Sequence, residues 1–129
     1  MDAVEDVWGK MTFDLAANAD NAKAPDYYTE EQDSLSQSWD IPGSLWLNPP
    51  YSRIGLWAKK CAESQRRVFL LVPASTGSNW FRDYVWDYAT VSFLAPRLTF
   101  DGHKDPYPKD LMLCVYGGRV EPARLWRWR

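Results

Sequence analysis

The tetrapeptide Asn48-Pro49-Pro50-Tyr51 is the part of this 129-residue sequence whose residue types and order could do chemistry. A planar exocyclic NH2 group is a poor nucleophile because its lone pair is delocalised into the ring. Two acceptors that bond both amino hydrogens make the nitrogen more tetrahedral and therefore more reactive. The Asn48 side-chain oxygen supplies one acceptor. The Pro49 backbone carbonyl supplies the other, since two prolines with fixed φ and no N–H hold it rigidly.

Tyr51 completes this interpretation with an aromatic ring. A base inside a duplex must be flipped out before an enzyme can reach it, and stacking on an aromatic ring offsets the lost stacking energy. The tetrapeptide therefore predicts transfer of an activated group to the amine of a planar base. Taken alone, these four residues are also compatible with a proline-stiffened turn that has no chemical role, although we favour the chemical interpretation.

The residues on either side predict the elements that position this loop. The apolar run Ser44–Leu47 predicts a strand that the two prolines end. A helix is expected to follow, with Ser52 as its cap. Its apolar positions at helical spacing are Ile54, Trp57, Ala58, Cys61 and Ala62.

The rest of the chain alternates further strands with a second helix. Strands are expected at residues 11–15, 68–72, 91–94 and 111–116. Ser78 is expected to cap the second helix, whose apolar stripe is Trp80, Phe81, Tyr84, Val85 and Tyr88. This alternation predicts an α/β fold with a mostly parallel, doubly wound sheet that binds ligands at the carboxyl ends of its strands.

Length and composition predict a single domain over residues 1–129. Apolar residues make up 46% and charged residues 25%, as in ordinary soluble proteins, without a membrane-spanning stretch or a signal peptide. We therefore expect a cytoplasmic protein. Cys61 and Cys114 are expected to be buried free thiols, and no metal site is predicted because neither has a CxxC pair or a histidine partner.

Charge is distributed unevenly along the chain. Residues 1–40 carry a net charge of −8, whereas residues 41–129 carry +6. A polyanion is therefore expected to contact the second part, although a solvated acidic face explains the same pattern. The tail of residues 119–129 carries +3 and interleaves tryptophan with arginine. These tryptophans either stack on bases or close over the protein's own core or a second subunit, and we favour closure.

Several segments together resemble a known family. They are Phe13–Lys23, Tyr28–Leu35 with Trp39, Trp46–Ser52, Leu70–Ala74, Trp80-Phe81, Arg97–Phe100 and Pro106–Pro108. Over roughly residues 12–116 the chain is similar to the phage-type DNA N-6-adenine methyltransferase family, the small Dam-like enzymes of phages and prophages.

The resemblance implies a class I, Rossmann-like methyltransferase fold that binds S-adenosylmethionine. The residues implied to bind this cofactor are Asp14, Ala16, Ala17, Asp33, Ser34 and Leu35, with Asp33 beside its adenine. Either aspartate could instead be a loop cap. Only 34 residues separate Asp14 from Asn48, and the first loop has no Gly-x-Gly motif, so the cofactor-binding residues 1–40 are expected to be an abbreviated version of this fold.

The implied reaction is methylation of the N6 amine of an adenine flipped out of double-stranded DNA, with residues 41–118 as the catalytic part. Arg53 and Arg97 are expected to contact phosphates, or alternatively to form salt bridges. Two other functions stay open. Similar loops methylate RNA amines or protein glutamine, and a shortened relative could bind DNA or a partner protein without catalysis. A domain of this size could also form a homodimer.

Overall fold

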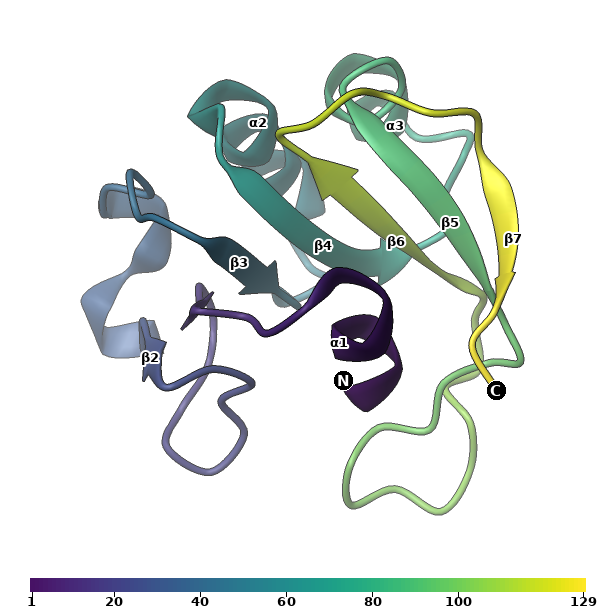
Figure 1. The fold of residues 1–129 in the computed structure, drawn as a ribbon, viewed down its shortest axis with the longest axis horizontal. Coiled ribbons are helices and arrows are strands. Elements are labelled where there is room, and N and C mark those ends of the chain that lie inside the picture. The colour runs from purple at the N-terminus through teal and green to yellow at the C-terminus, as the bar shows by residue number, and fades with distance from the viewer.

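Seven strands form one continuous sheet in the computed structural model, which describes residues 1–129 (Figure 1). The strands are β1 (Phe13–Asp14), β2 (Asp26–Tyr27), β3 (Ser44–Leu47), β4 (Arg67–Pro73), β5 (Ala89–Ala95), β6 (Leu111–Tyr116) and β7 (Arg124–Arg127). Their order across the sheet is β2-β1-β3-β4-β6-β5-β7. All neighbours are parallel except at β6, which runs antiparallel to both β4 and β5. The predicted α/β fold with a mostly parallel sheet is confirmed. The antiparallel direction of β6 was not predicted.

Helices cover both faces of the sheet. The α-helices are α1 (Asp2–Trp8), α2 (Ile54–Ser64) and α3 (Asn79–Tyr84), and the short 3-10 turns are η1 (Glu30–Gln32) and η2 (Ser34–Ser36). Helix α1 lies on the opposite face of the sheet from α2 and α3 (Figure 1). No helix combines the length and the apolar character needed to cross a bilayer.

Strand β4 faces two hydrophobic cores, which explains its unbroken apolar sequence. Val68, Leu70 and Val72 pack with α2 and α3, whereas Phe69 and Leu71 pack toward α1. The free thiols Cys61 and Cys114 are buried in the α2/α3 core, as predicted.

The first 40 residues form an abbreviated half of the sheet, as predicted. Strands β1 and β2 have two residues each, and the chain between Asp14 and Asn48 contains 3-10 turns but no α-helix. The sheet face on the α1 side therefore has little helical cover beyond the seven residues of α1.

Two details of the helices differ from expectation. Ser52 as the cap of α2 is wrong: residues 51–53 still belong to the turn after Pro50, so the N-cap is Arg53, which makes no capping bond through its side chain. Ser78 does cap α3, accepting a bond from the Phe81 N–H at 3.3 Å. Helix α3 ends at Tyr84, so Tyr88, the last residue of the predicted stripe, lies outside the helix and is 51% exposed.

Candidate active site

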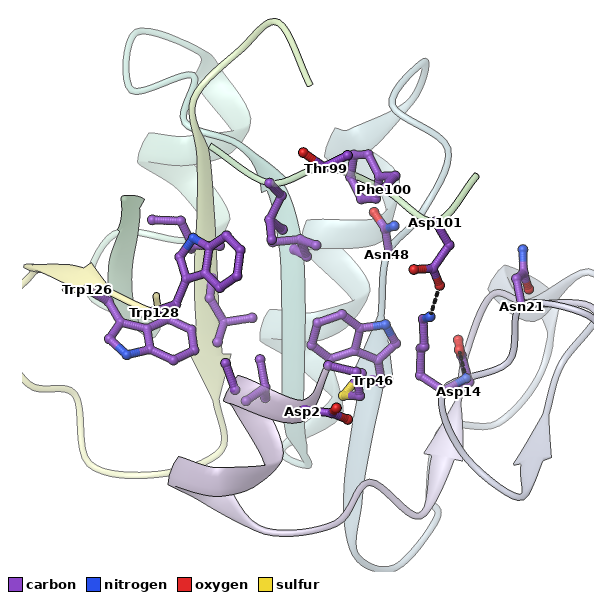
Figure 2. Close-up of a pocket in the computed structure, with 18 of the residues that line it drawn as sticks. Asp2, Asp14, Asn21, Trp46, Asn48, Thr99, Phe100, Asp101, Trp126 and Trp128 are labelled. Atoms are coloured by element: carbon purple, nitrogen blue, oxygen red, sulfur yellow. Dashed lines mark hydrogen bonds and ion pairs between the residues drawn. The ribbon is translucent and has the colours of Figure 1, made fainter. Parts of the chain in front are cut away.

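The loop after β3 and the end of β1 meet at one edge of the sheet. Asp14 pairs in register with Trp46, and Asn48 follows β3 directly. Because both strands run parallel, their carboxyl ends meet at the same edge. A cavity of about 580 Å3 opens there on the α1 side, and both Asp14 and Asn48 line it (Figure 2).

Asp14 organises the loop that follows β1. The residue is only 2% exposed, and its two carboxylate oxygens accept bonds from the backbone N–H groups of Ala16 at 3.1 Å and Lys23 at 2.9 Å. Burial raises the pKa of the Asp14 carboxyl, although these two backbone bonds oppose the shift. Asp14 therefore fixes the chain between Ala16 and Lys23 at the cavity wall.

Tyr51 holds the Asn48 side chain. Its hydroxyl donates to the Asn48 Oδ1 at 2.7 Å and lies 3.4 Å from the Leu71 carbonyl. Burial raises the pKa of the Tyr51 phenol well above its ordinary value, so the hydroxyl stays a donor. The Asn48 oxygen keeps a second lone pair for a ligand.

The Tyr51 ring belongs to an aromatic cluster instead of lining the cavity. It contacts Tyr107 edge-to-face at 5.9 Å, and Tyr107 contacts Phe100 in the same way at 5.5 Å. Phe100 itself lines the cavity. Of the tetrapeptide only Asn48 reaches the cavity wall, whereas Pro49 is buried beside it and Pro50 is exposed.

Acidic and aromatic side chains predominate among the large and charged residues that line the cavity. Its charged side chains are Asp2, Asp14, Lys23 and Asp101, and its large aromatic ones are Trp46, Phe100, Trp126 and Trp128. Lys23 Nζ lies 2.7 Å from Asp101 Oδ2 and joins the loop after β1 to the loop between β5 and β6 (Figure 2). With more carboxylates than ammonium groups, the cavity favours a cationic ligand over a phosphate.

The predicted cofactor residues separate into two groups. Ala16 lines the cavity with Asp14, and Ala17 lies next to it with its N–H bonded to the Tyr28 carbonyl.

Asp33, Ser34 and Leu35 do not line the cavity. Lys60 of α2 donates to the carbonyls of Ser34 and Leu35, at 3.3 and 2.8 Å, and Asp33 accepts from the Ser36 hydroxyl. These bonds hold η2 against α2. The cofactor role of these three residues stays a prediction.

The two predicted DNA-contacting arginines differ in their surroundings. Arg53 is exposed beside the Asn48–Tyr51 loop and has no carboxylate within ion-pair distance. Arg97 forms an ion pair with Asp110 at 2.9 Å, across the neck of the β5–β6 loop. Of the two, Arg53 is the one with a free guanidinium.

Sequence reasoning missed several residues of the cavity wall. Trp46, Lys23 and Asp101 had no assigned role, and α1 was not predicted, although its first residues line the cavity. A signal for α1 exists in the sequence: Val4 and Trp8 are four residues apart, and Asp2 and Glu5 lie in the first turn, where acidic residues favour a helix.

Comparison with known proteins agrees with the resemblance noted in the sequence. The chain is 28% identical to the DNA N-6-adenine-methyltransferase of Escherichia phage T1 over 139 aligned residues, which cover 95% of this chain. It is 34% identical over 53 residues, 37% of this chain, to the Escherichia coli protein YfdM, which is named as a methyltransferase. The matches span 58% of the length of each relative. The profile of the DNA N-6-adenine-methyltransferase (Dam) family matches residues 1–111, so this chain belongs to that family.

Proposed function

We propose that this chain methylates the N6 amine of an adenine flipped out of double-stranded DNA, with S-adenosylmethionine as the methyl donor. One observation carries the proposal: in a chain of this family, Asn48 lies at the carboxyl end of β3 and lines a cavity that Asp14 also lines. Action on DNA in the cytoplasm of a host cell follows from the same proposal.

The cavity fits the cofactor in size and charge. A volume of about 580 Å3 is that of an ordinary small-molecule site. S-adenosylmethionine carries a sulfonium and an ammonium group, which suit a wall with three aspartates and several aromatic rings. Asp14, Ala16 and Trp46 would hold it, with Ala17 behind Ala16. The cofactor supplies a methyl group that its sulfonium has already activated, so no acid is needed for the leaving group.

The protein's own contribution is to orient and polarise the amine. The second lone pair of Asn48 Oδ1 accepts one amino hydrogen, while the Tyr51 hydroxyl fixes the carboxamide. The Pro49 carbonyl accepts the other hydrogen, and its proline ring prevents competition from a backbone N–H. As the N–C bond forms, the nitrogen becomes more acidic and one proton leaves through these acceptors to water.

The direct test is mass spectrometry of nucleosides from adenine-containing duplex DNA incubated with the protein and S-adenosylmethionine. We expect N6-methyladenine from the wild type and a yield lower by about 10²- to 10³-fold with Asn48→Ala, the usual cost of removing one such polar group. Asn79→Ala is the matched control, because Asn79 is exposed on α3. A folded wild type that binds the cofactor and leaves DNA unmethylated would overturn the proposal.

The same assay separates the alternatives. Labelled methyl appearing in RNA or in a protein glutamine, instead of in DNA, would move the reaction to another planar NH2 group. A catalytically inactive binding protein is the second candidate, and the abbreviated strands β1 and β2 favour it. Calorimetry decides between the two, because an inactive protein of this kind would show no heat of binding with S-adenosylmethionine.

A further inference from the structure

The C-terminal segment Arg124–Arg129 forms one wall of the candidate active-site cavity. Strand β7 pairs in parallel with β5, and the Trp128 backbone N–H continues this pairing with a bond to the Ala95 carbonyl at 3.2 Å. Both Trp126 and Trp128 line the cavity. This segment lies beyond residue 111, where the match to the family profile ends.

Both indole rings are held in place by contacts outside the cavity. Trp128 Nε1 donates to the Pro96 carbonyl at 2.6 Å. Trp126 contacts Trp8 of α1 edge-to-face, with ring centroids 5.2 Å apart. A ring that is ordered before a ligand arrives loses little entropy when the ligand binds.

The cavity has two chemically different ends (Figure 2). At one end Trp126 and Trp128 pack with the apolar side chains of Leu94, Leu98 and Leu113. At the other end lie Asp14, Asn21, Asn48 and Asp101, which supply most of the polar and charged groups; Asp2 and Lys23 also line the cavity. A ligand that matches both ends has a flat apolar ring and a polar or cationic part.

We propose that Trp126 and Trp128 form a subsite for an adenine ring. Stacking of a base on an aromatic side chain contributes about 1–3 kcal/mol and needs no charged partner, in agreement with the leucine-lined surroundings. This inference rests on the proposed function, which supplies two sources of an adenine ring. They are the adenosine of the cofactor and the base extruded from DNA. Both present the same planar ring to the two tryptophans.

Trp128→Leu and Trp128→Phe test this subsite together. Both remove the indole N–H bond to Pro96, but only Phe keeps an aromatic face, so the difference between them isolates stacking. Trp86→Leu is the control, because Trp86 is 51% exposed and does not line the cavity. Trp126→Leu and Trp126→Phe are the second pair, should Trp128→Leu fail to fold, since of these two only the phenyl ring keeps an aromatic face and the edge contact with Trp8.

Two binding measurements distinguish the two sources of adenine. The first is calorimetry with adenosine and with S-adenosylmethionine. The second is the fluorescence of duplex DNA carrying 2-aminopurine at the target position, which rises when the base leaves the stack. We expect Trp128→Leu to weaken one of these signals by about 5- to 150-fold, the change that corresponds to about 1–3 kcal/mol, and Trp128→Phe to keep most of it.

Each outcome has a definite meaning. Weaker binding of adenosine and S-adenosylmethionine places the cofactor's adenine against Trp128, whereas loss of the 2-aminopurine signal alone places the target base there. Unchanged values in both measurements would overturn the subsite, even if the wild type methylates DNA. A wild type that methylates nothing, but whose adenosine affinity still falls in Trp128→Leu, would overturn the proposed function and leave the subsite standing.

Discussion

A hydrogen bond joins the side chains of Asn48 and Tyr51, and its geometry indicates what each residue does. The Tyr51 phenol donates to the Asn48 side-chain oxygen, one of the two acceptors that the proposed reaction requires, and leaves that oxygen one lone pair. The ring packs against Tyr107 instead of presenting its face to the cavity. The geometry therefore favours Tyr51 as the residue that positions Asn48, a role different from the base stacking predicted from sequence.

Tyr51→Phe should show this positioning role. The change removes the hydroxyl and keeps the ring, so we expect the rate of methyl transfer to fall about tenfold, equal to about 1.4 kcal/mol in the barrier, while the affinity for S-adenosylmethionine stays the same. Single-turnover methylation and calorimetry measure the two quantities. Tyr88→Phe, on an exposed ring, serves as the control. A tenfold loss of cofactor affinity with an unchanged rate would contradict the role.

Asp14 should make the stability of the fold depend on pH in a defined direction. Burial raises its pKa in the folded state above the ordinary 3.8, so the folded protein binds a proton more tightly than the unfolded chain. Its contribution to stability is therefore complete below pH 3.8 and is lost as the pH rises through the raised pKa.

Denaturant unfolding of wild type and Asp14→Asn at pH 7 and near pH 4.5 measures this effect. In the variant, the asparagine has only one side-chain oxygen, so one of the two backbone N–H groups has no acceptor at either pH. The free energy lost with that hydrogen bond is the same at both pH values and cancels when the two are compared. We expect the free energy of unfolding of the wild type, relative to the variant, to increase at the lower pH. A decrease would contradict the burial of the charge.

Among the elements, β4 and the antiparallel β6 form the centre of the sheet. The backbone just after β6 lies close to the backbone just before β4. Gly117 follows β6 with a φ of +84°, and a Cβ added there would lie 2.3 Å from the Arg66 carbonyl oxygen just before β4. Only glycine fits this position, both for its backbone conformation and for the space available.

Gly117→Ala should therefore destabilise the protein by about 2 kcal/mol or more, because it combines an unfavourable φ with a clash against backbone that cannot move aside. Gly77→Ala is the matched comparison, since a Cβ there meets nothing within 4 Å. Its expected effect is within about 0.5 kcal/mol of the wild type. Thermal unfolding of both variants measures the difference, and equal melting temperatures would contradict the close contact.

Over the whole molecule, charge separates the cavity proposed to bind the cofactor from the surface proposed to meet DNA. The acidic segment of residues 1–40 contributes Asp2 and Asp14 to the cavity, whereas Arg53 lies exposed beside the Asn48–Tyr51 loop. In the proposed function, this acidic wall favours a cationic cofactor over a phosphate. The backbone of DNA is therefore expected to stay outside the cavity and to contact the basic surface, so only the flipped base enters.

Arg53→Gln should lower the dependence of DNA affinity on salt. If Arg53 neutralises one phosphate, the slope of log K against log salt concentration becomes shallower by about 0.9. Fluorescence anisotropy of labelled duplex DNA at several salt concentrations gives this slope. Arg82→Gln is the control, because Arg82 is already paired with Asp83 on α3. An unchanged slope with Arg53→Gln would remove this arginine from the DNA contact.

The sequence by itself determined the features that depend on local pattern. Short apolar runs and the 3.6-residue spacing of apolar residues identified five strands and two helices, and the prolines after Leu47 placed the Asn48–Tyr51 loop at a strand end. These predictions succeed because proline geometry and side-chain periodicity act over a few residues.

Only the tertiary structure decided which distant residues meet. Lys23 and Asp101 pair across 78 positions, and Trp126 and Trp128 reach the cavity because β7 pairs with β5. The placement of Asp33 outside the cavity that Asp14 lines likewise follows from the packing of η2 on α2. Such contacts result from the balance of burial and hydrogen bonding over the entire fold, which no short stretch of sequence contains.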